Sequence, residues 1–264
     1  MAVLTLKIVN ADGAVLCEDR AEGFVDLVYT EEYREGTKIL LTCDETPVHL
    51  NIQLDDAVGA STVYLTGEFV YEIPFGEKKA NMSPKAFVGT DHYLFAEDVT
   101  ALTEGVYREL ACNRYDVAGQ PTSFPHASAN IETRNETVFA ARNAIDGVKA
   151  NLFHGQWPYT SWGINRRPDA EFTLAFGRKV MVDKILIYTR ADFPHDSWWT
   201  QATLTFSNGQ QLCCPLEKSR FAQVITFEEK EIEWLKLHDL IKADDPSPFP
   251  ALTQIQVYGK EVTQ

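Results

Sequence analysis

One segment of the C-terminal half gathers side chains that can bind a polar ligand. Residues 190–209, RADFPHDSWWTQATLTFSNG, contain Arg190, Asp192, His195, Trp198 and Trp199. Charged side chains can form paired hydrogen bonds to hydroxyl groups, and an aromatic face packs against the C–H groups of a sugar ring. The segment predicts either a binding loop or a packed corner in which Arg190 and Asp192 form a structural ion pair.

The two adjacent tryptophans of this loop are expected to differ in burial. They immediately precede an alternating strand, residues 202–206, and neighbouring strand residues point to opposite faces. One of Trp198 and Trp199 is therefore predicted to lie in the core, and the other to be freer to line a site. The bend at Phe193–Pro194 stiffens the loop, which lowers the ordering cost of binding.

A second segment is predicted to face the first across the same site. Residues 153–171, FHGQWPYTSWGINRRPDAE, contain His154, Trp157 and Arg166, which we expect opposite the first loop. Aromatic residues interleaved with arginine also occur in sites for single-stranded nucleic acid, but the acidic surroundings favour a neutral or anionic saccharide. Trp162 is expected to be structural.

Two further loops are polar enough to contribute. Residues 240–254, LIKADDPSPFPALTQ, hold three prolines that fix the backbone, and predict either a rim of the same site or a rigid crossing. Residues 125–136, PHASANIETRNE, are better explained as the first strand of a domain.

The elements that must position these loops are strands. Residues 47–56 alternate between apolar and polar side chains, and residues 37–43 and 61–75 behave similarly, as half-buried strands do. In residues 98–112 the apolar spacing changes to three and four, which predicts one helix with Asp98 as its cap. Strand patterns return at residues 171–176, 181–189, 202–206, 223–227 and 251–259.

These patterns predict an all-β chain of two β-sandwich domains with one connecting helix. Residues 1–112 form the first, a sandwich ending in that helix, and residues 119–264 form the second. Residues 113–125, which contain proline and glycine, are the predicted boundary. Residues 1–115 hold 9 Lys and Arg against 20 Asp and Glu, a net charge of −11, whereas residues 116–264 carry −3. The asymmetry supports two differently built halves.

The composition restricts the partners and the compartment. A net charge of −14 over 264 residues argues against nucleic acid and anionic membranes as partners. No run of eighteen apolar residues suggests a membrane span. The five cysteines are odd in number and include the neighbours Cys213 and Cys214, which favours free thiols in a reducing compartment. With no signal-peptide pattern in MAVLTLKIVNADG, we expect a cytoplasmic location.

An ordered set of motifs in the second half resembles a known family. The motifs are ARNAIDGVKANLFHGQW (141–157), DAEFTLAFGRKVMVDKILIYTR (169–190), ATLTFSNG (202–209) and LTQIQVYG (252–259). Over residues 125–260 they resemble the discoidin, or coagulation factor 5/8 C-type, domains. The resemblance implies the galactose-binding-like jelly roll that family 32 carbohydrate-binding modules share, with ligands held by loops at one end.

The resemblance favours a non-catalytic carbohydrate-binding protein. Discoidin-type folds also bind proteins, so a protein–protein adaptor using the same loops is the alternative, and a homo-oligomer stays open. The chain contains none of the G-x-S-x-G, H-E-x-x-H, C-x-x-C or glycine-rich phosphate motifs. A glycan-acting hydrolase assembled from His126, His154 and His195 is the remaining enzymatic alternative.

The resemblance also implies a structural calcium ion. The matching positions are Asp146, Asn151, where the family has threonine, and Gln254, where it has glutamate. Calcium takes six or more oxygen ligands, and these substitutions keep the oxygens while removing one negative charge. The alternative is that Asp146 caps its own turn with Gly147.

Overall fold

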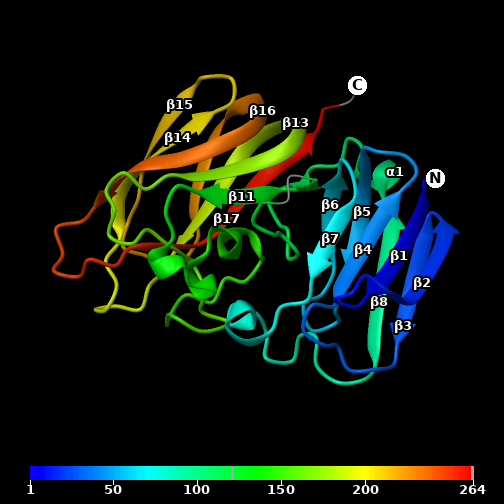
Figure 1. Cartoon of the computed structure of the whole chain (residues 1–264). Coiled ribbons are helices and arrows are strands. Elements are labelled where there is room, and N and C mark those ends of the chain that lie inside the picture. Colours follow the sequence, from blue (N-terminus) through cyan, green and yellow to red (C-terminus); the bar gives the residue numbers. More distant parts are fainter. Residues whose placement is uncertain (120–121, 263–264) are drawn as a thin grey trace.

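The chain folds into two packed β-units joined by a connector (Figure 1). The structure, a computed structural model, describes residues 1–119 and 122–262. We call residues 1–98 the N-terminal unit, 99–125 the connector and 126–262 the C-terminal unit. All strand pairs in the described residues are antiparallel, which confirms the predicted all-β fold class.

The N-terminal unit consists of two facing sheets. The first has the order β2–β1–β4–β7, with β1 Val3–Val9, β2 Val15–Glu22, β4 Lys38–Cys43 and β7 Phe69–Glu72. The second contains β3 Phe24–Tyr29, β5 Val48–Gln53, β6 Ser61–Leu65 and β8 His92–Asp98. The connector adds the edge strand β10, Ser123–Phe124, so that the order is β10–β6–β5–β8–β3. Alternate residues of β1, namely Leu4, Leu6 and Ile8, are fully buried. This period of two makes one face of the sheet a core face.

The helix predicted over residues 98–112 is wrong in length. The helix α1 comprises only Thr100–Thr103, and the chain then enters β9, Arg108–Glu109, which pairs with the final strand. Gly105 has a φ of +66°, which ends the helical path. Leu102 and Val106 are exposed whereas Val99 and Leu110 are buried, so the apolar spacing of three and four does not mark one buried helix face.

The C-terminal unit is a jelly roll built on three long strands. Its strands are β11 His126–Ala129, β12 Trp162–Gly163, β13 Phe172–Thr189, β14 Trp199–Phe206, β15 Gln211–Pro215, β16 Gln223–Lys242 and β17 Ala251–Glu261. Its short 3₁₀ turns are η2 Thr133–Asn135, η3 Thr137–Phe139 and η4 Ala141–Ile145, whereas η1, Gly76–Lys79, belongs to the N-terminal unit. The pairing order is β12–β17–β13–β16–β14–β15, with β11 also beside β13. Register shifts bend β13 and β16, so that residues from both ends of β13 reach one core.

Two hydrophobic cores meet at the connector. Leu110 and Ala111 pack into the core of the C-terminal unit, whereas Tyr115 packs into that of the N-terminal unit. The predicted limits 1–112 and 119–264 stay predictions, and Gln120 and Pro121 of the predicted boundary lie outside the described residues. In the residues that the structure covers, no helix is long and apolar enough to cross a membrane.

The strand registers bring the predicted binding loops to one end of the jelly roll. Thr189, the last residue of β13, pairs with Leu252 near the start of β17, and Trp199 at the start of β14 pairs with Lys242 at the end of β16. The β13–β14 loop (190–198) and the β16–β17 loop (243–250) therefore leave the same edge of the sheet. A hydrogen bond of 2.8 Å from Ala191 N–H to the Asn151 carbonyl joins the segment before β12 to these loops.

Candidate functional site

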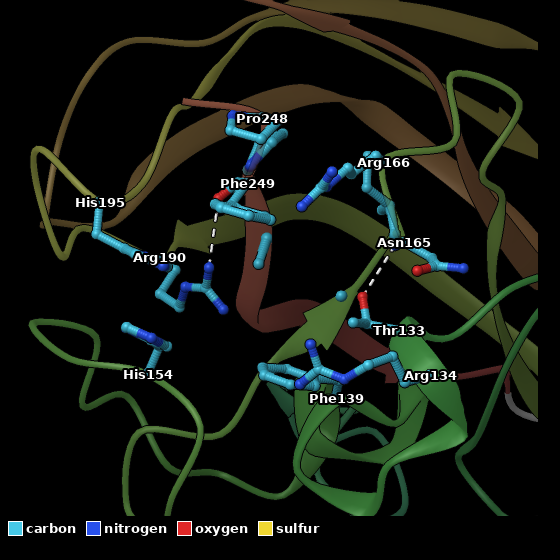
Figure 2. A pocket seen from close by; sticks show the side chains of 14 residues that line it. Thr133, Arg134, Phe139, His154, Asn165, Arg166, Arg190, His195, Pro248 and Phe249 are labelled. Carbon is cyan, nitrogen blue, oxygen red and sulfur yellow. Dashed lines mark hydrogen bonds between the residues drawn. The ribbon is translucent and has the colours of Figure 1, made fainter. Parts of the chain in front are cut away.

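A cavity of about 350 Å³ lies between these loops. Its walls come from four segments: residues 133–139 after β11, residues 154–166 around β12, the β13–β14 loop and the β16–β17 loop. Its side chains include His154, Arg166, Arg190, His195, Phe139 and Phe249 (Figure 2). This volume falls within the range of about 300–1,000 Å³ that ligand cavities occupy.

A buried ion pair organises the β13–β14 loop. The Arg190 guanidinium, 4% exposed, donates from Nε and Nη2 to the carboxylate of Asp196, with Nη2 at 2.6 Å from Oδ1. The same carboxylate accepts the Asp192 N–H at 2.9 Å and lies 3.0 Å from Nδ1 of His195. Nη2 of Arg190 also reaches the Phe249 carbonyl of the neighbouring loop, at 3.4 Å. A bidentate, buried pair of this kind holds both loops in one geometry.

Two histidines and a phenylalanine form a continuous stack along one side of the cavity. The rings of His154 and His195 are parallel within 5°, with centroids 3.8 Å apart, and His195 stacks on Phe249 at 5.1 Å. Nδ1 of His154 lies 2.6 Å from Oδ2 of Asp192. Since a carboxylate accepts, each histidine carries its hydrogen on Nδ1 and keeps Nε2 for another partner.

Two arginines contact the aromatic rings of the cavity. The Arg166 guanidinium lies over the ring of Phe249, 4.8 Å from its centroid, and Arg134 lies over Phe139 at 5.5 Å. In Figure 2, His195 and Arg166 appear on opposite sides of Phe249, with Phe139 below them. Two aromatic rings and fixed polar groups therefore surround the same space.

The predicted site residues fall into two groups. The cavity is lined by Arg190, His195, His154 and Arg166. Asp192 does not line it but is hydrogen-bonded to His154, which does. Three predicted tryptophans do not line it: Trp157, Trp198 and Trp199.

The tryptophans have other roles in the structure. As predicted, the two adjacent tryptophans differ in burial: Trp199 is fully buried in the core, whereas Trp198 is partly exposed. The Trp198 ring packs beside Phe193, and Nζ of Lys218 lies 4.7 Å from its centroid. Trp157 lines a separate depression that includes Met82 of the N-terminal unit. Trp162 is fully buried and donates from Nε1 to the Ile131 carbonyl, as expected of a structural residue.

Phe139, Phe249 and Arg134 are site residues that the sequence prediction missed. Phe249 lies between Pro248 and Pro250, in the loop predicted as either a rim of the site or a rigid crossing, so the proline pattern was a usable signal. Arg134 lies in the segment predicted as a strand, but β11 ends at Ala129 and Arg134 follows in η2. Phe139 lies in η3, where no periodic pattern marks it.

Comparison with known proteins finds similarity in solved structures only. No protein-family model matches the chain, and no curated protein matches its sequence. A family 32 carbohydrate-binding module of Clostridium perfringens NanJ, in complex with galactose, is 18% identical over 58% of this chain and 99% of that module, with a TM-score of 0.41.

Two further solved structures are similar to the same extent. A fucose-binding module of Streptococcus pneumoniae is 14% identical, and chitosan-binding module 1 of a Paenibacillus chitosanase/glucanase is 15% identical. Each covers 58% of this chain and is itself covered to 99%, with TM-scores of 0.41 and 0.38. These structures are carbohydrate-binding modules, the class that the sequence motifs resemble.

One group of side chains in the site is close enough to hold a metal ion. Three potential ligand atoms, one each from His154, Asp192 and His195, all lie within 4.8 Å of one another. The lone pairs of imidazole nitrogens lie in the ring plane, and the two rings are stacked in parallel. A shared ion would therefore require one ring to turn out of the stack.

The side chains predicted to hold calcium are occupied by backbone partners. Asp146 Oδ1 accepts the Val148 N–H at 2.7 Å, and Gln254 Oε1 accepts the Gly147 N–H at 3.2 Å. The Asn151 amide donates to two carbonyl groups, of Thr189 and Arg220. Two of the predicted ligand oxygens, those of Asp146 and Gln254, are thus already hydrogen-bonded, whereas calcium takes six or more oxygens. Calcium at this position stays a prediction to be tested.

The burial of Asp146 gives a measurable pH dependence. Burial raises the pKa of Asp146 to about 7, although the Val148 hydrogen bond and the charges of Arg142 and Arg114 act to lower it. The folded state thus keeps a proton that the unfolded state loses near pH 4, so the free energy of unfolding falls as pH rises from about 4 to 7. In Asp146→Asn this loss, on the order of a few kcal/mol, should be absent. Urea unfolding at pH 5 and pH 8 measures it.

The same pair of proteins tests the calcium prediction. Calcium chloride that raises the melting temperature of the original chain, but not of Asp146→Asn, would support an ion at this carboxylate. Equal pH dependence of both proteins would contradict the buried, protonated state of Asp146.

Proposed function

We propose that the chain binds a saccharide in the cavity between the four loops and does not act on it chemically. The main observation behind this proposal is that two aromatic rings, Phe139 and Phe249, lie beside polar groups whose positions are fixed by buried hydrogen bonds. An aromatic face packs against sugar C–H groups, while fixed polar groups orient the hydroxyls.

The stack of His154, His195 and Phe249 suits hydroxyl recognition. Each imidazole is oriented by a carboxylate at Nδ1, so its Nε2 can accept a hydrogen bond from a ligand hydroxyl. These side chains are already ordered by Asp192 and Asp196, and a ligand would not have to immobilise them. Pre-ordering of this kind suits sugars, which offer only a small apolar area.

The lining also supports binding without catalysis. A glycosidase needs two carboxyl groups that flank the scissile bond. Among the described residues that line the cavity, none is aspartate or glutamate. The nearby carboxylates of Asp192 and Asp196 are engaged by His154 and Arg190.

Replacing His195 with alanine should abolish saccharide binding while the chain stays folded. The His195 side chain is 39% exposed, so its removal should cost no more than about 1 kcal/mol of unfolding free energy. It nevertheless forms the middle of the stack, and its loss removes one hydroxyl partner and the support of Phe249. A glycan array probed with both proteins measures binding, and circular dichroism melting checks folding.

His238→Ala is the matched control, because His238 lies on β16 and bonds to Thr205 rather than to the cavity. It should bind the same glycans as the original chain. An array on which the original chain binds no glycan, together with a stable protein partner in a pull-down, would instead favour an adaptor.

A further inference from the structure

Among the described residues, the wall of the cavity contains arginines but no carboxylate, although the chain is strongly acidic. Three arginines and two histidines line it, and in the described parts of the chain no carboxylate does. The whole chain carries a net charge of −14. The absence of acidic side chains from this wall is therefore a property of the cavity and not of the whole chain. It favours a ligand that is not positively charged.

Two of the three arginines are already neutralised. Arg190 is paired with the buried Asp196, and Arg134 donates from Nε and Nη2 to both oxygens of Glu136, at 2.6 and 2.7 Å. Arg166 is different: within the described residues no carboxylate lies at ion-pair distance from it. Its guanidinium stacks on Phe249, which covers one face of the group and leaves its N–H edges for a ligand.

The backbone holds Arg166 in an unusual conformation at the edge of the cavity. Asn165 and Arg166 have φ angles of +49° and +60°, in the left-handed region that non-glycine residues seldom adopt. The turn is fixed by a hydrogen bond of 2.9 Å from Asn165 N–H to Oγ1 of Thr133 (Figure 2). A Cβ on Gly163 would lie 2.6 Å from the same Oγ1, so the two segments pack closely. Backbone strain of this kind concentrates at binding sites.

The adjacent Arg167 shows the ordinary surface arrangement. It donates from Nε to Asp169 at 2.7 Å, and it does not line the cavity. Of the two consecutive arginines, Arg167 lies outside the cavity and has a carboxylate partner, whereas Arg166 lines the cavity and has none in the described residues.

We propose that the ligand is an acidic saccharide whose carboxylate pairs with Arg166. This inference rests on the proposed saccharide binding. A guanidinium only donates hydrogen bonds and a carboxylate only accepts them, whereas neutral hydroxyls also need acceptors. The two histidines offer acceptors at Nε2 on the other side of Phe249 from Arg166 in Figure 2, and the side-chain oxygens of Thr133 and Asn165 also line the cavity. The sugar hydroxyls therefore meet the histidines, and the carboxylate meets the arginine.

The test compares neutral sugars with the matching sugar acids. Glucose, galactose and mannose are titrated into the full chain by calorimetry, each beside its uronic acid, which differs only by a carboxylate at C6. At least one acid should bind about tenfold or more tightly than its neutral partner, because charge-assisted hydrogen bonds are stronger than neutral ones. This preference should weaken as salt is added.

Variants of the two adjacent arginines show which residue causes the preference for the acid. In Arg166→Gln, the acid should bind no more tightly than the neutral sugar, whereas Arg167→Gln should keep the full preference. Melting curves check that both variants fold.

The outcomes separate this inference from the proposed function. Equal binding of each acid and its neutral partner by the original chain overturns the acidic-ligand inference and leaves saccharide binding standing. An acid preference that survives in Arg166→Gln overturns the role of Arg166. If no sugar or acid binds, saccharide binding itself fails, and the inference fails with it.

Discussion

Replacing Asp196 with alanine is expected to lower the free energy of unfolding by about 3–5 kcal/mol and to abolish ligand binding. The Asp196 side chain is fully buried and is the counter-ion of Arg190, which is itself only 4% exposed. Without the carboxylate, Arg190 would keep a buried charge without compensation, and the Asp192 N–H would lose its acceptor. Urea unfolding and the glycan array measure the two effects.

Asp169→Ala provides the control for this prediction. Asp169 also pairs with an arginine, Arg167, but both side chains are more than half exposed, so solvent screens the pair. Its loss should leave stability and binding nearly unchanged. If Asp196→Ala is no less stable than Asp169→Ala, the buried pair does not hold the loop.

Replacing Glu261 with glutamine should have a comparable effect on stability, because this carboxylate joins the two units. Glu261 on β17 accepts hydrogen bonds from Arg108 at 2.6 Å and from Arg178 at 2.7 Å, and it lies 3.2 Å from Nε2 of His49 on β5. The side chain is 10% exposed. Glutamine would leave two partly buried guanidinium groups without their counter-charge, at a cost of about 3–5 kcal/mol.

The pH dependence of this effect follows from the pKa of Glu261. Burial alone would raise it, but the hydrogen bonds and charges of Arg178 and His49 hold the pKa well below its ordinary value. The stabilisation is therefore present above the unfolded-state pKa, about 4.3, and is lost as pH falls toward the folded-state pKa. Urea unfolding should show the full difference between the two proteins at pH 7 and a smaller one at pH 3.

Glu229→Gln is the control for this second prediction. Glu229 pairs with the neighbouring Lys260, but both side chains are more than 40% exposed, so the change should be much smaller. A difference for Glu261→Gln that does not shrink in acid would mean that lost packing, rather than lost charge, causes it.

The strands were predictable because burial imposes a period of two on the sequence. Residues 47–56 were predicted as a strand, and β5, Val48–Gln53, lies there with Leu50 and Ile52 fully buried. The helix over residues 98–112 was predicted from apolar spacing alone, and that spacing does not show whether a core faces it. Here Val99 and Leu110 are buried while Leu102 and Val106 are exposed, so the four side chains do not form one buried helix face.

The site was only partly predictable because loop residues follow no period. The charged side chains of the β13–β14 loop were identified by their chemical types, and Arg190 and His195 line the cavity. One of the adjacent tryptophans of the loop was expected to be the aromatic partner, but Trp199 lies in the core and Trp198 does not line the cavity. The left-handed turn at Arg166 was also hidden, because no glycine marks it.

A crystal structure of the chain with a glycan selected from the array tests the central claim most directly. The account predicts a sugar ring in the cavity of about 350 Å³, against Phe139 or Phe249, with a hydroxyl on Nε2 of His154 or His195. A sugar bound elsewhere with this cavity empty, for example in the depression beside Trp157 and Met82, would contradict it.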